Sequence, residues 1–205
     1  MAGGTLIMAK LKLNSYELFS QSSNNRPVYG SGVPAGTIVQ VQHTQFTGTA
    51  NTGSISAGTR TVLFDSASST EILNVTIKPQ FQTSTIWLQC MWCGEHDGDS
   101  PQDSMFGFKR GTTDLISPLI GSDTSRTRGI APPTRASSGS DAGSTMEACY
   151  FQYFDSPNTT NQILYKTTII NGGNITIYTN RTKSFGNNDG NEQGISSIIA
   201  MEIAA

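Results

Sequence analysis

Hydrophobic and polar residues alternate with a period of two along most of the chain after Thr37, a pattern that is typical of β-strands. Val39, Val41 and His43 open this pattern on one face, with mostly polar residues between them. Residues 84–93 are the most apolar stretch and predict a central core strand. Nine strands are expected: residues 37–46, 61–65, 71–79, 84–93, 104–110, 146–154, 163–170, 174–181 and 195–203.

Short turns rich in Gly, Ser, Asn and Pro separate the predicted strands, and helix-forming runs are absent from the sequence. Asn171-Gly172-Gly173 predicts a hairpin between the two strands that flank it. Strands at this spacing, without a fixed repeat, favour a sandwich over a propeller or a β-helix. We therefore predict an all-β fold, a jelly-roll-like antiparallel β-sandwich over residues 37–205.

Residues 1–36 differ in character from the rest. A short amphipathic piece, LKLNSYELF, is followed by a string of Ser, Asn and Gly that contains Pro27 and Pro34. Because the prolines disfavour helix and the glycines disfavour a packed core, this segment predicts an extended N-terminal arm. The candidate residues by which the arm would anchor to a partner are Tyr16, Leu18 and Phe19.

Two polar stretches predict long loops, at residues 94–103 and 111–145. The first holds the only dense group of potential metal ligands in the sequence, which consists of Glu95, His96, Asp97 and Asp99. Carboxylates two residues apart can chelate a hard cation, but the further spaced carboxylates of a calcium loop are missing. A solvated acidic turn is the better interpretation, so we predict a surface-binding loop and no metal site.

Composition argues against two classes of partner. Charged residues make up 14% of the 205 residues and the net charge is −2, so there is no basic field to hold a phosphate backbone. No apolar run approaches the roughly 20 residues that span a bilayer. The first residues also lack the apolar core of a signal peptide. We expect no nucleic-acid partner and no membrane insertion.

The three cysteines, Cys90, Cys93 and Cys149, are an odd number and fit no complete disulfide framework. Cys90 and Cys93 form a Cys-x-x-Cys pair, but no second pair or spaced histidines complete a zinc site. Residues three apart in a strand also point to opposite faces. Core packing of reduced cysteines is the better interpretation, and we expect no cofactor.

Candidate catalytic groups lack the partners that their chemistry needs. The sequence has two histidines, His43 and His96, and no Gly-x-Ser-x-Gly nucleophile motif. Asp97 and Asp99 form a carboxylate pair of the kind that glycosidases use, but no apolar wall flanks them to separate their pKa values. We predict no catalytic residues and a protein that is not an enzyme.

Two predicted strands are apolar on both faces, which indicates that both faces are buried. In residues 146–154 one face can fill the core, while Tyr150 or Tyr153 on the other meets another subunit. The last strand does not keep strict alternation either. A contact between copies of the chain is therefore predicted at Tyr150, Tyr153, Ile199 and Met201.

The carboxyl-terminal stretch carries a set of short motifs: Asp155-Ser156-Pro157, Tyr165-Lys166, Tyr178 with Asn180-Arg181, and Gly194-Ile195-Ser196 leading to Met201-Glu202-Ile203. With GTIVQVQ at 36–42 and ILNVTIKPQFQTSTIWLQC at 72–90, they make residues 36–205 resemble a module of known proteins. That module ends small fibre and appendage structural proteins of tailed phages, of the type common in phages of marine bacteria and cyanobacteria.

The resemblance implies a jelly-roll-like sandwich, a homotrimer and a place on the virion after assembly in the host cytoplasm. Only the 36-residue arm precedes the module, in place of the long shaft usual in such proteins. The expected protein is thus a short fibre, a spike or a capsid decoration subunit, bound to other virion structural proteins through residues 1–36 and able to aid host attachment.

The sequence leaves two other functions open. One is a carbohydrate-binding module of a tail fibre that recognises a host-surface glycan through the two long loops, Trp92 and the tyrosines. The other, which is weaker, is a polysaccharide hydrolase, since that activity asks for paired acidic residues in a groove and a much longer chain.

Overall fold

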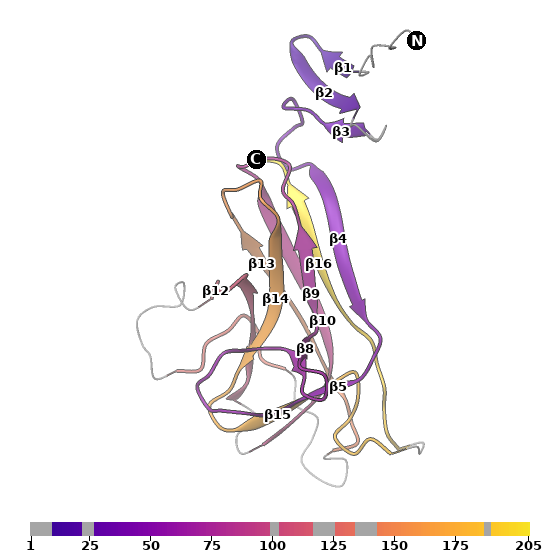
Figure 1. The fold of residues 1–205 in the computed structure, drawn as a ribbon, viewed down its shortest axis with the longest axis vertical. Helices are drawn as coiled ribbons and strands as arrows, with labels where there is room; N and C mark the ends of the chain where they lie inside the picture. The colour runs from indigo at the N-terminus through magenta and orange to yellow at the C-terminus, as the bar shows by residue number, and fades with distance from the viewer. Residues whose placement is uncertain (1–9, 22–26, 99–102, 117–125, 134–142, 187–189) are drawn as a thin grey trace, which may run out of the picture.

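A computed structural model of the chain describes residues 10–21, 27–98, 103–116, 126–133, 143–186 and 190–205. Within these ranges the fold is all-β and the strands pair antiparallel (Figure 1), which confirms the predicted fold class. The strands are β1 (Lys10–Leu13), β2 (Tyr16–Gln21), β3 (Pro27–Tyr29), β4 (Ile38–Phe46), β5 (Ala50–Ile55), β6 (Thr61–Val62), β7 (Phe64–Asp65), β8 (Thr70–Glu71), β9 (Asn74–Ile77), β10 (Thr85–Gly98), β11 (Met105–Arg110), β12 (Thr113–Asp114), β13 (Glu147–Asp155), β14 (Ile163–Ile170), β15 (Ile175–Thr179) and β16 (Ser196–Ile203).

Two large sheets form the sandwich. The first has the order β4-β16-β10-β15-β5, and β13 also pairs with β10. The second has the order β12-β11-β14-β6, with β9 also paired to β14. Between them lies a buried aromatic cluster in which Trp92 and Phe151 of the first sheet meet Phe106 and Phe108 of the second. Neighbouring ring centroids are 5.0 to 5.1 Å apart, so the two inner faces interdigitate.

Strand β10 is the centre of the first sheet, as the apolar stretch 84–93 predicts. It pairs with β13 and β16 along its first part and with β15 along its last part. The strand continues to Gly98, so the prediction of an acidic loop is wrong for residues 94–98. The physical reason is that alternation persists there: His96 is buried in register with Ile177, while Glu95 lies on the opposite face.

The link at residues 171–173 is not the predicted hairpin, because β14 and β15 belong to different sheets. Asn171 is fully buried, and its carbonyl accepts a hydrogen bond from Gly58 N at 2.7 Å. Its Oδ1 accepts from Ser104 Oγ at 2.8 Å, and its Nδ2 donates to Gly173 O at 2.9 Å. These bonds stabilise a crossover from one sheet to the other.

Strand β5 has no counterpart among the predicted strands, because its sequence ANTGSI lacks apolar alternation. The hydroxyl of Thr52 accepts a hydrogen bond from Ile177 N at 3.0 Å, at the irregularity between β5 and β15. The predicted loop 111–145 is also partly structured, since it contains β12 and the buried residues Leu115 and Ile116. Residues 117–125 and 134–142 of that loop lie outside the described residues.

The N-terminal arm is itself folded into a small sheet of order β1-β2-β3, which extends beyond one end of the sandwich (Figure 1). The amphipathic segment LKLNSYELF forms the β1-β2 hairpin, and Gly30 N donates a hydrogen bond to Leu18 O at 2.9 Å. The arm enters the sandwich beside the carboxyl terminus. There Gly36 N donates to Ala204 O at 2.8 Å, and Ala204 N donates to Thr37 O at 2.9 Å.

Candidate functional site

The candidate binding loop at residues 95–99 is divided between the two faces of β10. His96 is buried in the core, whereas Glu95 lies on the outer face and its Oε2 accepts from Lys183 N at 2.5 Å. Burial raises the pKa of Glu95 above its usual range, and the hydrogen bond from Lys183 opposes that effect. Asp97 forms an ion pair with Lys183 Nζ at 2.9 Å, and Asp99 lies outside the described residues. The described members therefore do not converge on one surface.

Metal and thiol chemistry find little support in this geometry. Across the described ranges, no three Cys, His, Asp or Glu side chains gather closely enough to hold a metal ion. Cys90 and Cys149 are buried, and burial raises the pKa of Cys90 to about 12 and that of Cys149 to about 11. Thiols with such pKa values stay protonated at neutral pH and are poor nucleophiles.

Trp92 lies where it cannot serve the carbohydrate-binding hypothesis. Its side chain is fully buried between the sheets, and its Nε1 donates to Thr179 Oγ1 at 3.1 Å. The indole ring is therefore not available to stack on a sugar. That hypothesis loses Trp92 and keeps only the tyrosines as aromatic groups, of which Tyr150 is exposed.

A continuous apolar row crosses the first sheet on its outer side. Residues paired across antiparallel strands share a face, so the register places Val41, Met201, Trp87 and Phe154 side by side on β4, β16, β10 and β13. The rings of Trp87 and Phe154 stack with centroids 5.4 Å apart, and Trp87 Nε1 donates to Gln152 Oε1 at 3.1 Å. We call this surface the outer sheet face and define it as Val41, His43, Gln45, Thr85, Trp87, Gln89, Met91, Tyr150, Gln152, Phe154, Ser197, Ile199, Met201 and Ile203.

The outer sheet face combines exposed apolar side chains with an absence of charge. Val41, Met91, Tyr150 and Phe154 are 44% to 58% exposed. None of the residues that define this face is Asp, Glu, Lys or Arg. An apolar surface of this kind, spread over neighbouring strands, is typical of a site that a partner covers.

The outer side of the second sheet is charged by comparison. Lys166 of β14 pairs with the partly exposed Glu71 at 2.7 Å, and Lys109 of β11 lies beside Lys166 on the same side. Charged and polar groups of this kind are usual on a surface that faces water. The contrast distinguishes the outer sheet face from the rest of the sandwich.

The structure brings together three of the four residues predicted to contact another copy. Tyr150, Ile199 and Met201 lie on the outer sheet face. Tyr153 lies on the inner face instead, where its OH donates to Leu115 O at 3.4 Å, because an offset of three residues in a strand reverses the side. Sequence reasoning missed the other three members of the row, Val41, Trp87 and Phe154. The period of two in residues 84–93 predicts the face on which Trp87 lies. Only the pairing register shows which residues of the neighbouring strands lie beside it.

The small N-terminal sheet has two unlike faces. The register pairs Leu11 with Phe19 and Leu13 with Tyr16, and all four side chains are exposed on one face. Lys12 pairs with Glu17 on the other, where Lys10 Nζ also contacts Glu17 Oε2 at 2.7 Å.

Two of the three candidate anchor residues, Tyr16 and Phe19, thus share the apolar face of the arm. Leu18 sits at the bulge, where the register between β1 and β2 shifts, and it is half-buried.

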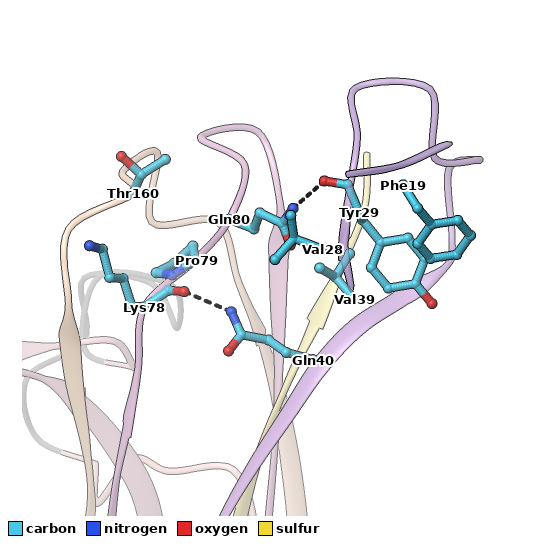
Figure 2. A pocket seen from close by; sticks show the side chains of 9 residues that line it. All are labelled: Phe19, Val28, Tyr29, Val39, Gln40, Lys78, Pro79, Gln80 and Thr160. Atoms are coloured by element: carbon cyan, nitrogen blue, oxygen red, sulfur yellow. Dashed lines mark hydrogen bonds between the residues drawn. The ribbon is translucent and has the colours of Figure 1, made fainter. Parts of the chain in front are cut away.

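A hollow of about 810 Å³ lies between the arm and the sandwich (Figure 2). The rings of Phe19 and Tyr29, with centroids 4.9 Å apart, line its arm side. On the sandwich side, Gln40 Nε2 donates to Lys78 O at 2.7 Å. Gln80 crosses from the sandwich to hydrogen-bond the carbonyl of Tyr29. The arm is therefore held to the sandwich by a polar bridge beside an open hollow.

The outer sheet face and the arm each expose a group of apolar side chains. Within the part of the chain that the structure describes, no helix is both long and apolar enough to cross a membrane. Neither a protein-family model nor a curated protein matches the sequence.

Proposed function

We propose that this protein is a non-enzymatic structural subunit that associates with copies of itself through the outer sheet face and attaches to a larger particle through its N-terminal arm. The resemblance of residues 36–205 to appendage proteins of tailed phages makes a phage virion the proposed particle and a homotrimer the proposed assembly. The observation that carries the proposal is the apolar, uncharged outer sheet face.

The size of the outer sheet face supports an interaction. Four strands about 4.8 Å apart, followed over seven residues of about 3.3 Å each, give a projected area on the order of 400 Å². Apolar patches of about 300–600 Å² are often functional. A stable interface needs about 800 Å² from each partner, so the contact also includes surface beside these rows.

The chemistry of the outer sheet face favours a second copy of the chain as its occupant. A charged partner would lose hydration against this face and gain no ion pair in return. The same face of another copy offers what is needed, namely apolar rings together with amides such as Gln89 and Gln152 that can hydrogen-bond one another. Interfaces between identical chains are also the commonest kind in soluble assemblies.

A charge placed on the outer sheet face tests this proposal. Met201→Lys puts an ammonium group in the middle of the apolar row, and Thr76→Lys puts the same group on the exposed outer side of β9 in the second sheet. We expect Met201→Lys to weaken self-association by about 100-fold, because the buried ammonium has no partner. Thr76→Lys should leave it unchanged.

Sedimentation velocity over a dilution series measures this difference, and circular dichroism verifies that both variants keep their β structure. If both variants self-associate as strongly as the unmodified protein does, the proposed role of the outer sheet face is contradicted.

A further inference from the structure

Arg181 follows β15, and it is clasped by two aromatic rings. Its guanidinium carbon lies 4.8 Å from the centroid of Tyr178 and 5.1 Å from that of Phe185. The ring faces attract the cation, while the N–H donors radiate from the edge of the guanidinium plane. Tyr178 of β15 pairs with Glu95 near the end of β10 that lies farthest from the arm (Figure 1). Arg181, which contacts Tyr178, therefore lies toward that end of the sandwich.

The backbone before Arg181 is held rigidly in an unusual conformation. Asn180 is fully buried and has a φ of 61°, in the left-handed region that asparagine adopts more readily than most residues other than glycine. Its Nδ2 donates to Phe46 O at 2.6 Å and to Gly48 O at 2.7 Å, and its Oδ1 accepts from Ser196 Oγ at 2.6 Å. Such conformations persist where the surroundings fix them, and they cluster at ligand clamps. Arg181 is therefore presented by a preorganised support.

Arg181, unlike Arg60 and Arg110, forms no ion pair with another residue in the described part of the chain. Arg60 pairs with Asp114 and Arg110 pairs with Asp155, each at 3.0 Å. The side chain of Arg181 has neither an ion pair nor a hydrogen bond among the described residues, and its guanidinium packs against the two rings.

Carboxylates near Arg181 limit the charge of a ligand. Lys183 is already neutralised by Asp97 at 2.9 Å, and Glu95 lies close by on the same face of the sheet. With that ion pair neutralised, the site offers one positive charge, that of Arg181, near one further carboxylate, that of Glu95. That balance fits a singly charged anion better than a phosphate dianion or a polyanion.

We infer that Arg181 is a binding site for a singly charged carboxylate whose adjoining ring lies over Phe185. The guanidinium edge can bind both carboxylate oxygens at once, which is its strongest hydrogen-bonding mode. Phe185 is 44% exposed, so part of its ring can receive a flat apolar surface. Aromatic acids and uronic acids both carry this chemistry. The site does not depend on self-association, and it extends the proposed function from assembly to ligand binding.

Saturation-transfer NMR on the full chain tests the site with matched probes. Benzoate and methyl glucuronide represent the two acid sources, benzamide and methyl glucoside are their neutral analogues, and acetate is a carboxylate without a ring. We expect at least one ring acid to bind with a millimolar Kd, about tenfold or more tighter than its neutral analogue and than acetate. The acid that binds identifies the source.

Three variants assign the binding to this site. Arg181→Gln should weaken the affinity for the ring acid at least tenfold. Phe185→Leu should reduce that affinity toward the affinity for acetate. Lys78→Gln removes the same charge at the arm end of the molecule and should change nothing. The inference is overturned if neither acid exceeds its neutral analogue, if acetate binds as well as the ring acids, or if Arg181→Gln binds as the unmodified protein does.

Discussion

Glu202 shows how a single buried side chain joins distant parts of this fold. It is fully buried at the end of β16, and its Oε1 accepts hydrogen bonds from Gln80 N at 2.8 Å, Phe81 N at 3.0 Å and Ser84 Oγ at 2.7 Å. Its Oε2 accepts from Gln40 Nε2 at 2.6 Å. Because Gln80 also bonds the arm, Glu202 orients the segment that connects the arm to the sandwich.

We expect Glu202→Gln to lower the free energy of unfolding by about 2–4 kcal/mol. The amide removes the charged acceptor and turns an NH₂ group toward one of the donors, which leaves a buried polar group unsatisfied. Glu71→Gln is the matched control, because its ion pair with Lys166 is partly exposed and should contribute less than about 1 kcal/mol. Urea unfolding at one fixed protein concentration measures both. Equal losses for the two variants would contradict the role given to Glu202.

Sequence alone predicts the side on which many residues lie but not what those residues contact. Ile198 and Ala200 are buried, and Ile199 is partly exposed, because successive side chains of a strand point to opposite faces even where both are apolar. Three of the four donors to Glu202 come from a turn far away in the sequence and the fourth from β4, so no local pattern predicts them. For the same reason the sequence does not reveal the support of Asn180, whose side-chain partners lie on two distant segments.

At the scale of elements, alternation located most of the strands, and it failed where tertiary contacts override local preference. Asn171-Gly172-Gly173 has the composition of a hairpin turn, but its buried asparagine bonds to Gly58 and Ser104 and directs the chain into the other sheet. Glu95 and Asp97 look like loop residues, but pairing with β15 keeps them in β10. Tertiary pairing, which depends on distant segments, decides both cases.

The arm should be separable from the sandwich. Deleting residues 1–35 keeps Gly36, whose N–H bonds Ala204, and removes the small sheet with its exposed apolar face. We expect the truncated protein to stay folded, with a Tm within a few degrees of the full chain, and to keep its self-association. The truncated protein should not bind to particles that were prepared without this subunit. The full chain, added to the same particles in a separate sample, is the control and should bind. Decoration of those particles by the truncated protein would contradict attachment through the arm.

At the scale of the whole molecule, three surfaces occupy three different places. Figure 1 shows the arm at one end of the sandwich and β15 at the other. Arg181 contacts Tyr178 of β15, and the outer sheet face lies on β4, β16, β10 and β13. Copies packed through the outer sheet face could therefore point their arms in one direction and their Arg181 sites in the other. Several weak sites presented together would bind a repeating ligand far more tightly than one site does.

The mass of the unmodified protein in solution tests the central claim most directly. Sedimentation equilibrium over a dilution series, from about 100 µM downward, reports whether the 21.9 kDa chain associates. The account predicts a closed assembly, three times the chain mass for the proposed trimer, that dissociates on dilution or on introduction of Met201→Lys. A single species at 21.9 kDa across the whole series would contradict it.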